Sequence, residues 1–189
     1  MISSLLILSL LAQTPDTSAR DELTAFNTKR LKLLRGSMVV IGSWAVVNMA
    51  GAGVGWALSH DDRARTFWEG TAIWNTVNLG LGVIGLLMTR HDDSAELDLK
   101  ASLSQGDTYE KLFLFNGGLD VAYFVGAAFL LEHGSRTGEV KWTGYGNALL
   151  VQAGFLLVFD LTLFFLHRRI DKQIMNRLVL TPNGVGLSF

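Results

Sequence analysis

Two aspartates and a set of carboxamide side chains lie in otherwise uncharged, apolar stretches of this sequence. Asp120 and Asp160 are the only charged residues within 112–131 and 142–166, respectively. The carboxamides that we single out in comparable stretches are Asn48, Asn75, Asn78, Asn116 and Gln152. Carboxyl and amide groups of this kind can bind a proton, a cation or a small ligand, because they supply oxygen ligands and hydrogen-bond partners away from water.

The alternative for the same residues is structural. Asparagine and aspartate side chains can hydrogen-bond across helices, and each such bond contributes under about 2 kcal/mol in a membrane. For the asparagines alone we favour this structural role. For Asp120 and Asp160 together we favour function, because neutral side chains could make the same hydrogen bonds without burying an ionisable group.

The elements that must position these residues are four charge-poor segments, at about 36–58, 68–88, 112–131 and 145–166. Each has about the 20 residues needed to cross a bilayer. The central segment, Thr71 to Met88, places Asn75 and Asn78 three residues apart and therefore on one helical face. With 49% apolar residues, the sequence predicts an all-α protein, an integral membrane four-helix bundle. A soluble bundle is the weaker alternative, because soluble helices usually carry a charged outer face.

The flanking segments predict three further features. Residues 1–19 are a possible signal peptide or a disordered N-terminus. Residues 20–35 carry apolar residues on one side among basic ones, which is typical of an N-terminal amphipathic interfacial helix. Residues 167–189 form a basic juxtamembrane segment and a short C-terminal tail, with a small hairpin or an extended tail around Pro182 to Gly184.

Lysine and arginine predict the orientation. Twelve of the sixteen lie in the N-terminal segment, the connection between the second and third helices, and the C-terminal segment. Arg63, Arg65, Arg136 and Lys141 lie in the other two connections. By the positive-inside rule both termini are expected in the cytoplasm, whereas a cleaved signal peptide would predict the reverse.

Small residues spaced along the helices predict close helix packing, because they let backbones approach in lipid. The residues expected at such contacts are Gly51, Gly55, Gly80, Gly118, Ala122 and Gly126. The run Gly80-Leu-Gly-Val-Ile-Gly85 also has the spacing of a dinucleotide-binding loop. That loop must follow a strand and open a helix, whereas this run lies inside an apolar helix, so helix packing is the better interpretation.

Several chemistries have little support. The chain has no cysteine, which excludes disulfides and thiol catalysis, and a net charge of -1 gives no basis for a nucleic-acid partner. We predict no catalytic residues, no required cofactor and no metal site. Histidines near the helix ends are only weak metal candidates, with His60 and His133 expected on one side of the membrane and His91 and His167 on the other.

The segments 26–56, 67–86, 109–130 and 144–167 resemble a family of small four-span bacterial membrane proteins without an assigned function. The resemblance implies four helices in a bacterial plasma membrane and transfers no activity. Two hypotheses therefore remain: a membrane protein that binds or passes a proton, cation or small ligand, or a structural or accessory subunit. The expected partners are the lipid bilayer and either further copies of this chain or a larger membrane complex.

Overall fold

The computed structural model describes residues 17–90, 93–181 and 184–187. Four long helices make up most of this part of the chain: α2 (Thr17–Leu58), α3 (Asp62–Met88), α4 (Leu99–Thr137) and α5 (Val140–Met175). A short 3-10 helix, η1 (Ser94–Glu96), precedes α4, and the strands β1 (Leu178–Thr181) and β2 (Gly184–Leu187) follow α5.

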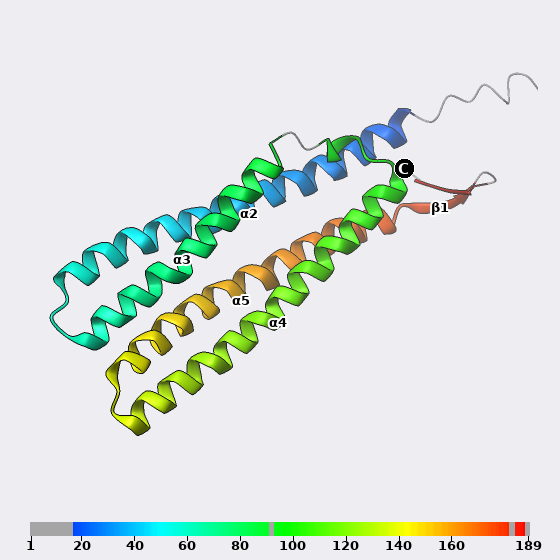
Figure 1. Ribbon diagram of the computed structural model, residues 1–189. Coiled ribbons are helices and arrows are strands. Elements are labelled where there is room, and N and C mark those ends of the chain that lie inside the picture. The colour runs from blue at the N-terminus through cyan, green and yellow to red at the C-terminus, as the bar shows by residue number, and fades with distance from the viewer. Residues whose placement is uncertain (1–16, 91–92, 182–183, 188–189) are drawn as a thin grey trace, which may run out of the picture.

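The helices form two antiparallel hairpins, α2 with α3 and α4 with α5, which lie side by side (Figure 1). Helix α5 packs against α4, α3 and, less extensively, α2, whereas α4 makes its extensive contacts with α5. We call the end with the α2–α3 and α4–α5 connections the hairpin end. The opposite end, where α2 begins and α5 finishes, is the terminal end.

Local sequence explains where the helices begin and end. The Asp61 carboxylate accepts a hydrogen bond from the Ala64 amide and caps the start of α3, and Asp98 caps α4 through the Ala101 amide in the same way. Gly138 adopts φ 73°, a left-handed conformation that favours glycine, and it terminates α4 before α5 begins. The two hairpins therefore turn within a few residues.

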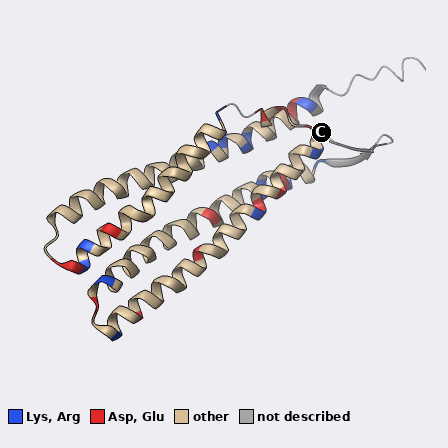
Figure 2. Cartoon of the chain, in the orientation of Figure 1, with Lys and Arg blue, Asp and Glu red and all other residues tan. Residues whose placement is uncertain are grey.

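Polarity is distributed in the reverse of the soluble pattern. Asn75 and Gln152 are completely buried, whereas Val47 is 69% exposed and Phe129 is 63% exposed. The middle sections of the helices carry little charge, and lysine and arginine gather toward the terminal end (Figure 2). All four helices are long and apolar enough to cross a membrane.

The helices extend well beyond the segments expected from hydropathy. Helix α2 has 42 residues and is about 63 Å long at 1.5 Å per residue, about twice the hydrocarbon thickness. It continues without interruption through 20–35, the section predicted as an interfacial helix that leads into the first span. This section has internal partners, because Asn27 and Arg30 are buried against residues 95–102 and α5.

The C-terminal hairpin is confirmed. Strands β1 and β2 pair antiparallel, with Leu178 opposite Leu187 and Thr181 opposite Gly184. Its turn residues, 182–183, lie outside the described residues, as do residues 1–16, which carry most of the proposed signal peptide.

Glycine packing agrees only partly with the sequence prediction. A Cβ at Gly55 would overlap the Trp68 ring, and one at Gly126 would be 3.7 Å from Leu149. In contrast, Gly51, Gly80 and Gly118 have no atom within 4 Å of that position, and Ala122 is exposed. These four do not pack within the chain, because their faces point out of the bundle. Other glycines at which an added Cβ would lie 3.0 Å or less from a neighbouring atom include Gly82, Gly85, Gly106, Gly134, Gly144 and Gly146.

Candidate functional site

The two aspartates in the apolar middle sections of the helices, Asp120 and Asp160, meet between α4 and α5. Asp120 and Asp160 are only 3% and 5% exposed, and their carboxyl groups are close enough to hydrogen-bond to each other when one is protonated. Asn116 lies one helical turn before Asp120 on α4, and its amide nitrogen is 3.5 Å from Asp160 Oδ1. Among the described residues neither carboxylate has an ion-pair partner, and Asp120 Oδ2 has no hydrogen-bond partner.

These carboxyls lie on the wall of an elongated groove of about 480 Å3. The groove is open on one side, because α3 and α4 do not pack extensively against each other. Its polar lining comes from Asn78, Asn116, Asp120 and Asp160, and the rest of its wall is mainly apolar. Trp74 on α3 and Tyr123 on α4 meet edge to face at 5.0 Å toward the hairpin end. From Trp74 to Met88 the groove follows α3 for about 21 Å.

The predicted polar residues thus divide into two groups. Asn78, Asn116, Asp120 and Asp160 come together along the groove, as their depths predicted. Asn48, Asn75 and Gln152 do not line it. Asn75 connects the groups, because the Asn78 amide lies 3.5 Å from Asn75 Oδ1.

The second group is bonded within the bundle. Trp44 Nε1 donates to Gln152 Oε1 at 3.0 Å and so links α2 to α5, and the Trp44 ring stacks on Phe155 at 3.9 Å. Asn48 donates to the Trp44 carbonyl, and Asn75 donates to the Thr71 carbonyl, each within its own helix. These bonds fit the structural role that we favoured for the asparagines.

A third polar cluster, at the terminal end, was not expected from the sequence. The Arg30 guanidinium is completely buried, pairs with Asp171, and donates to both the carbonyl and the hydroxyl of Ser102. Ser102 in turn donates to Asn27 Oδ1 at 2.6 Å, and Asn27 donates to the Leu97 carbonyl at 3.0 Å. This Arg30 cluster joins α2, α4 and α5 and the segment between η1 and α4.

The sequence predicts Arg30 only as one of several basic residues near a membrane surface. The available signal was the spacing of Asn27, Arg30 and Leu34, which share one face of α2, as residues three and four apart do. A buried arginine needs a carboxylate partner, but the sequence separates Arg30 from Asp171 by 141 positions. No local pattern identifies that partner.

His60 and His133 both lie at the hairpin end, on the same side as their spacing predicted, and the described histidines have separate surroundings. His167 is completely buried and packs between Tyr109 and Phe113, whereas His133 contacts Phe129 and Trp142. His60 is exposed, and His91 lies outside the described residues. Within the described ranges, no group of three His, Asp or Glu side chains could hold a metal ion.

Comparison with known proteins identifies the class to which these helices belong. The model of a family of unknown function, DUF6992, matches residues 40–161, about two thirds of the chain. The chain therefore belongs to that family. No curated protein and no solved structure gives a significant match. The matched region contains all four polar residues of the groove, Asn78, Asn116, Asp120 and Asp160. Arg30, His167 and Asp171 lie outside it.

Proposed function

We propose that this chain is an integral membrane protein that binds a proton, a cation or a small cationic ligand in the groove between α3 and α4. The supporting observation is that Asp120 and Asp160 lie on the wall of an apolar groove without a cationic partner among the described residues. Carboxyls at membrane depth are costly unless they are protonated, paired or bound to a ligand.

The shape of the groove favours a ligand that reaches it from the bilayer. The open side faces outward between two helices whose outer residues are apolar, such as Val77 and Leu119. A volume of about 480 Å3 lies within the usual range for small-molecule sites. An apolar body would contact the groove wall, and an ammonium or another hydrogen-bond donor would meet the carboxyls and the Asn78 and Asn116 amides.

The test is the effect of ligands and pH on thermal stability in a mild neutral detergent. We would measure the melting temperature of the parent, Asp120→Asn and Asp160→Asn from pH 5 to 9. Each would be tested with sodium, potassium, magnesium or dodecylamine, and with dodecanol as the uncharged control. The parent should gain stability from a cation or the amine, and both variants should lose that gain and show a flatter pH dependence.

Asp107→Asn is the matched control, since it removes an exposed carboxylate from the same helix outside the groove. It should behave as the parent does. Superimposable curves for all four proteins would make the aspartates structural hydrogen-bonding residues and would overturn the proposal.

The second candidate is a structural or accessory subunit. The observation that favours it is that Gly51, Gly118 and Ala122 face outward, so a neighbouring helix could approach them closely. Affinity purification in mild detergent should then recover a defined membrane partner, and Gly118→Leu should abolish its recovery. Recovery of the chain alone would disfavour this candidate.

A further inference from the structure

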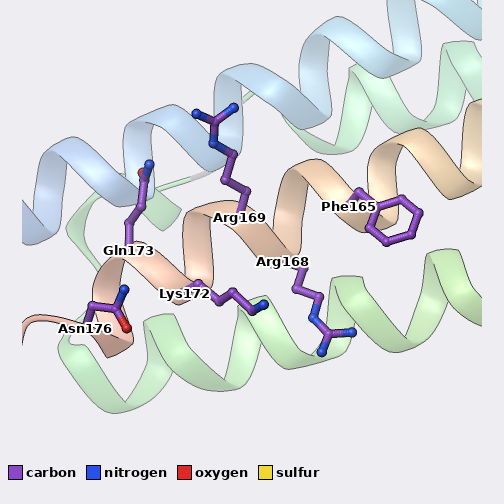
Figure 3. Close-up of a pocket in the computed structure, with 6 residues that line it drawn as sticks. All are labelled: Phe165, Arg168, Arg169, Lys172, Gln173 and Asn176. Carbon is purple, nitrogen blue, oxygen red and sulfur yellow. The ribbon is translucent and has the colours of Figure 1, made fainter.

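A basic face lies at the terminal end of α5, separate from the groove. It consists of Arg168, Arg169, Lys172, Gln173 and Asn176, and it borders a shallow cavity of about 490 Å3 together with Phe165 (Figure 3). In Figure 3, Arg169 extends toward α2 and Arg168 toward α4, with Lys172 between them. The three cations therefore spread around an open depression on one side of the helix.

No salt bridge among the described residues uses the three cations of this face, although the Arg168 charge acts on the nearby Glu110 carboxylate. The ion pairs in the described part of the chain use Arg30, Lys111, Arg136, Lys141 and Arg177. Arg168 instead lies over the Phe164 ring at 5.6 Å. A fourth cation approaches from α2, where Lys29 Nζ donates to Gln173 Oε1 at 3.1 Å. The depression thus holds positive charge from two helices.

An apolar stripe leads directly to this face along the same helix. Val151, Val158 and Phe165 are 45%, 68% and 63% exposed and lie seven residues apart, so they follow one side of α5. Arg168, Arg169 and Lys172 come three, four and seven residues after Phe165, on that same side. The surface therefore changes from apolar to cationic within one helical turn.

We propose that the basic face binds the headgroup of an anionic phospholipid, with an acyl chain lying along Val151, Val158 and Phe165. A phosphate matches guanidinium and ammonium groups that form no salt bridge, and arginine can hold it through two parallel hydrogen bonds. The terminal end carries most of the lysine and arginine, and basic sites at that side of membrane proteins suit anionic lipids. The apolar stripe favours a lipid over a soluble phosphate, because only a lipid can contact both the basic face and the apolar stripe.

The experiment is competition for a phosphatidylglycerol that carries a fluorescent tail, bound to the purified protein in neutral detergent. Unlabelled phosphatidylglycerol should displace it, and phosphatidylcholine with the same chains should not. The variant Arg168→Gln/Arg169→Gln/Lys172→Gln should bind about a hundredfold more weakly, since each basic residue near an anionic surface contributes about fivefold. The variant Arg168→Lys/Arg169→Lys keeps the charge but loses the paired guanidinium hydrogen bonds, so it should bind more tightly than the glutamine variant and less tightly than the parent.

The matched control is Arg20→Gln/Arg90→Gln/Lys100→Gln, which removes three exposed cations from the same end but leaves the basic face intact. It should bind as the parent does. The proposal is overturned if the basic-face variant binds like the parent, or if the control weakens binding equally. Displacement by inorganic phosphate as effective as that by the lipid would indicate a soluble-anion site, and equal displacement by phosphatidylcholine would indicate acyl contact alone.

Discussion

Arg30 is the residue whose environment most strongly constrains the terminal end. Its side chain is completely buried, its partner Asp171 is 8% exposed, and its Nη1 donates to the carbonyl and the hydroxyl of Ser102. Replacing both members of a buried ion pair can be neutral, but removing one of them leaves a charge without compensation. The cluster therefore stabilises the chain only while it is complete.

We predict that Arg30→Met lowers the free energy of unfolding by about 3–5 kcal/mol, because Asp171 is then left buried and unpaired. The measurement is reversible unfolding in sodium dodecyl sulfate. Lys32→Met is the control on the same helix, where the side chain is exposed and the expected change is within about 0.5 kcal/mol. Arg30→Met/Asp171→Leu should recover part of the loss. Equal losses for Arg30→Met and Lys32→Met would contradict the role assigned to this cluster.

At this scale the sequence predicted the meeting of the polar residues that line the groove, but it did not predict the Arg30 cluster. Depth along each helix was enough to bring Asn78, Asn116, Asp120 and Asp160 together, because antiparallel helices place residues of equal depth side by side. Depth could not tell that Asn75 and Gln152 face away from the groove, since that depends on the rotation of each helix. Nor could it identify the burial of Arg30, which comes from contacts across the terminal end.

Among the elements, the α2–α3 hairpin shows where close approach is required. A Cβ at Gly82 would lie 3.0 Å from the Gly42 backbone, and one at Gly85 would overlap the Met38 side chain. These contacts support the packing interpretation of the Gly80–Gly85 run. Gly118 and Ala122 on α4 differ, because an added Cβ at Gly118 would have no atom within 4 Å and Ala122 is exposed.

We predict that Gly82→Leu lowers the melting temperature in detergent much more than Gly118→Leu does. At Gly82 a large side chain must separate two helix backbones, a change that typically costs on the order of 1–3 kcal/mol. At Gly118 it enters open space. Similar melting temperatures for the two variants would contradict the α2–α3 contact. A loss at Gly118 that requires a co-purified protein would instead support the accessory-subunit function.

The helices extend past the predicted membrane-spanning segments for one physical reason. Hydropathy detects only the section of a helix that suits lipid, and each helix here continues past that section into a polar region. Asp98 and Gly138 could be identified as cap and terminator once the helices were seen to reach them, because their local chemistry is distinctive. For α2, the polar 20–35 section has the composition of a surface helix, and only its contacts with η1, α4 and α5 show that it is partly buried.

For the whole molecule, the arrangement of the helices and the distribution of charge point to one orientation. Both helix connections of the hairpin end lie together, and the start of α2, the α3–α4 connection and the end of α5 lie together at the other (Figure 1). The terminal end is the side that holds the larger share of lysine and arginine (Figure 2). A membrane crossed by all four helices must therefore separate these two ends.

We predict that the terminal end is cytoplasmic, and the absence of cysteine makes a direct test possible without altering other residues. Glu96→Cys places one exposed thiol between α3 and α4, and Arg136→Cys places one near the α4–α5 connection. In intact bacterial cells expressing each variant, a membrane-impermeant maleimide should label Arg136→Cys and should label Glu96→Cys only after the cells are opened. Asp61→Cys should behave like Arg136→Cys, because both lie at the hairpin end. Labelling of Glu96→Cys in intact cells, with Arg136→Cys protected, would reverse the orientation, and labelling of both would show that the helices do not separate two compartments.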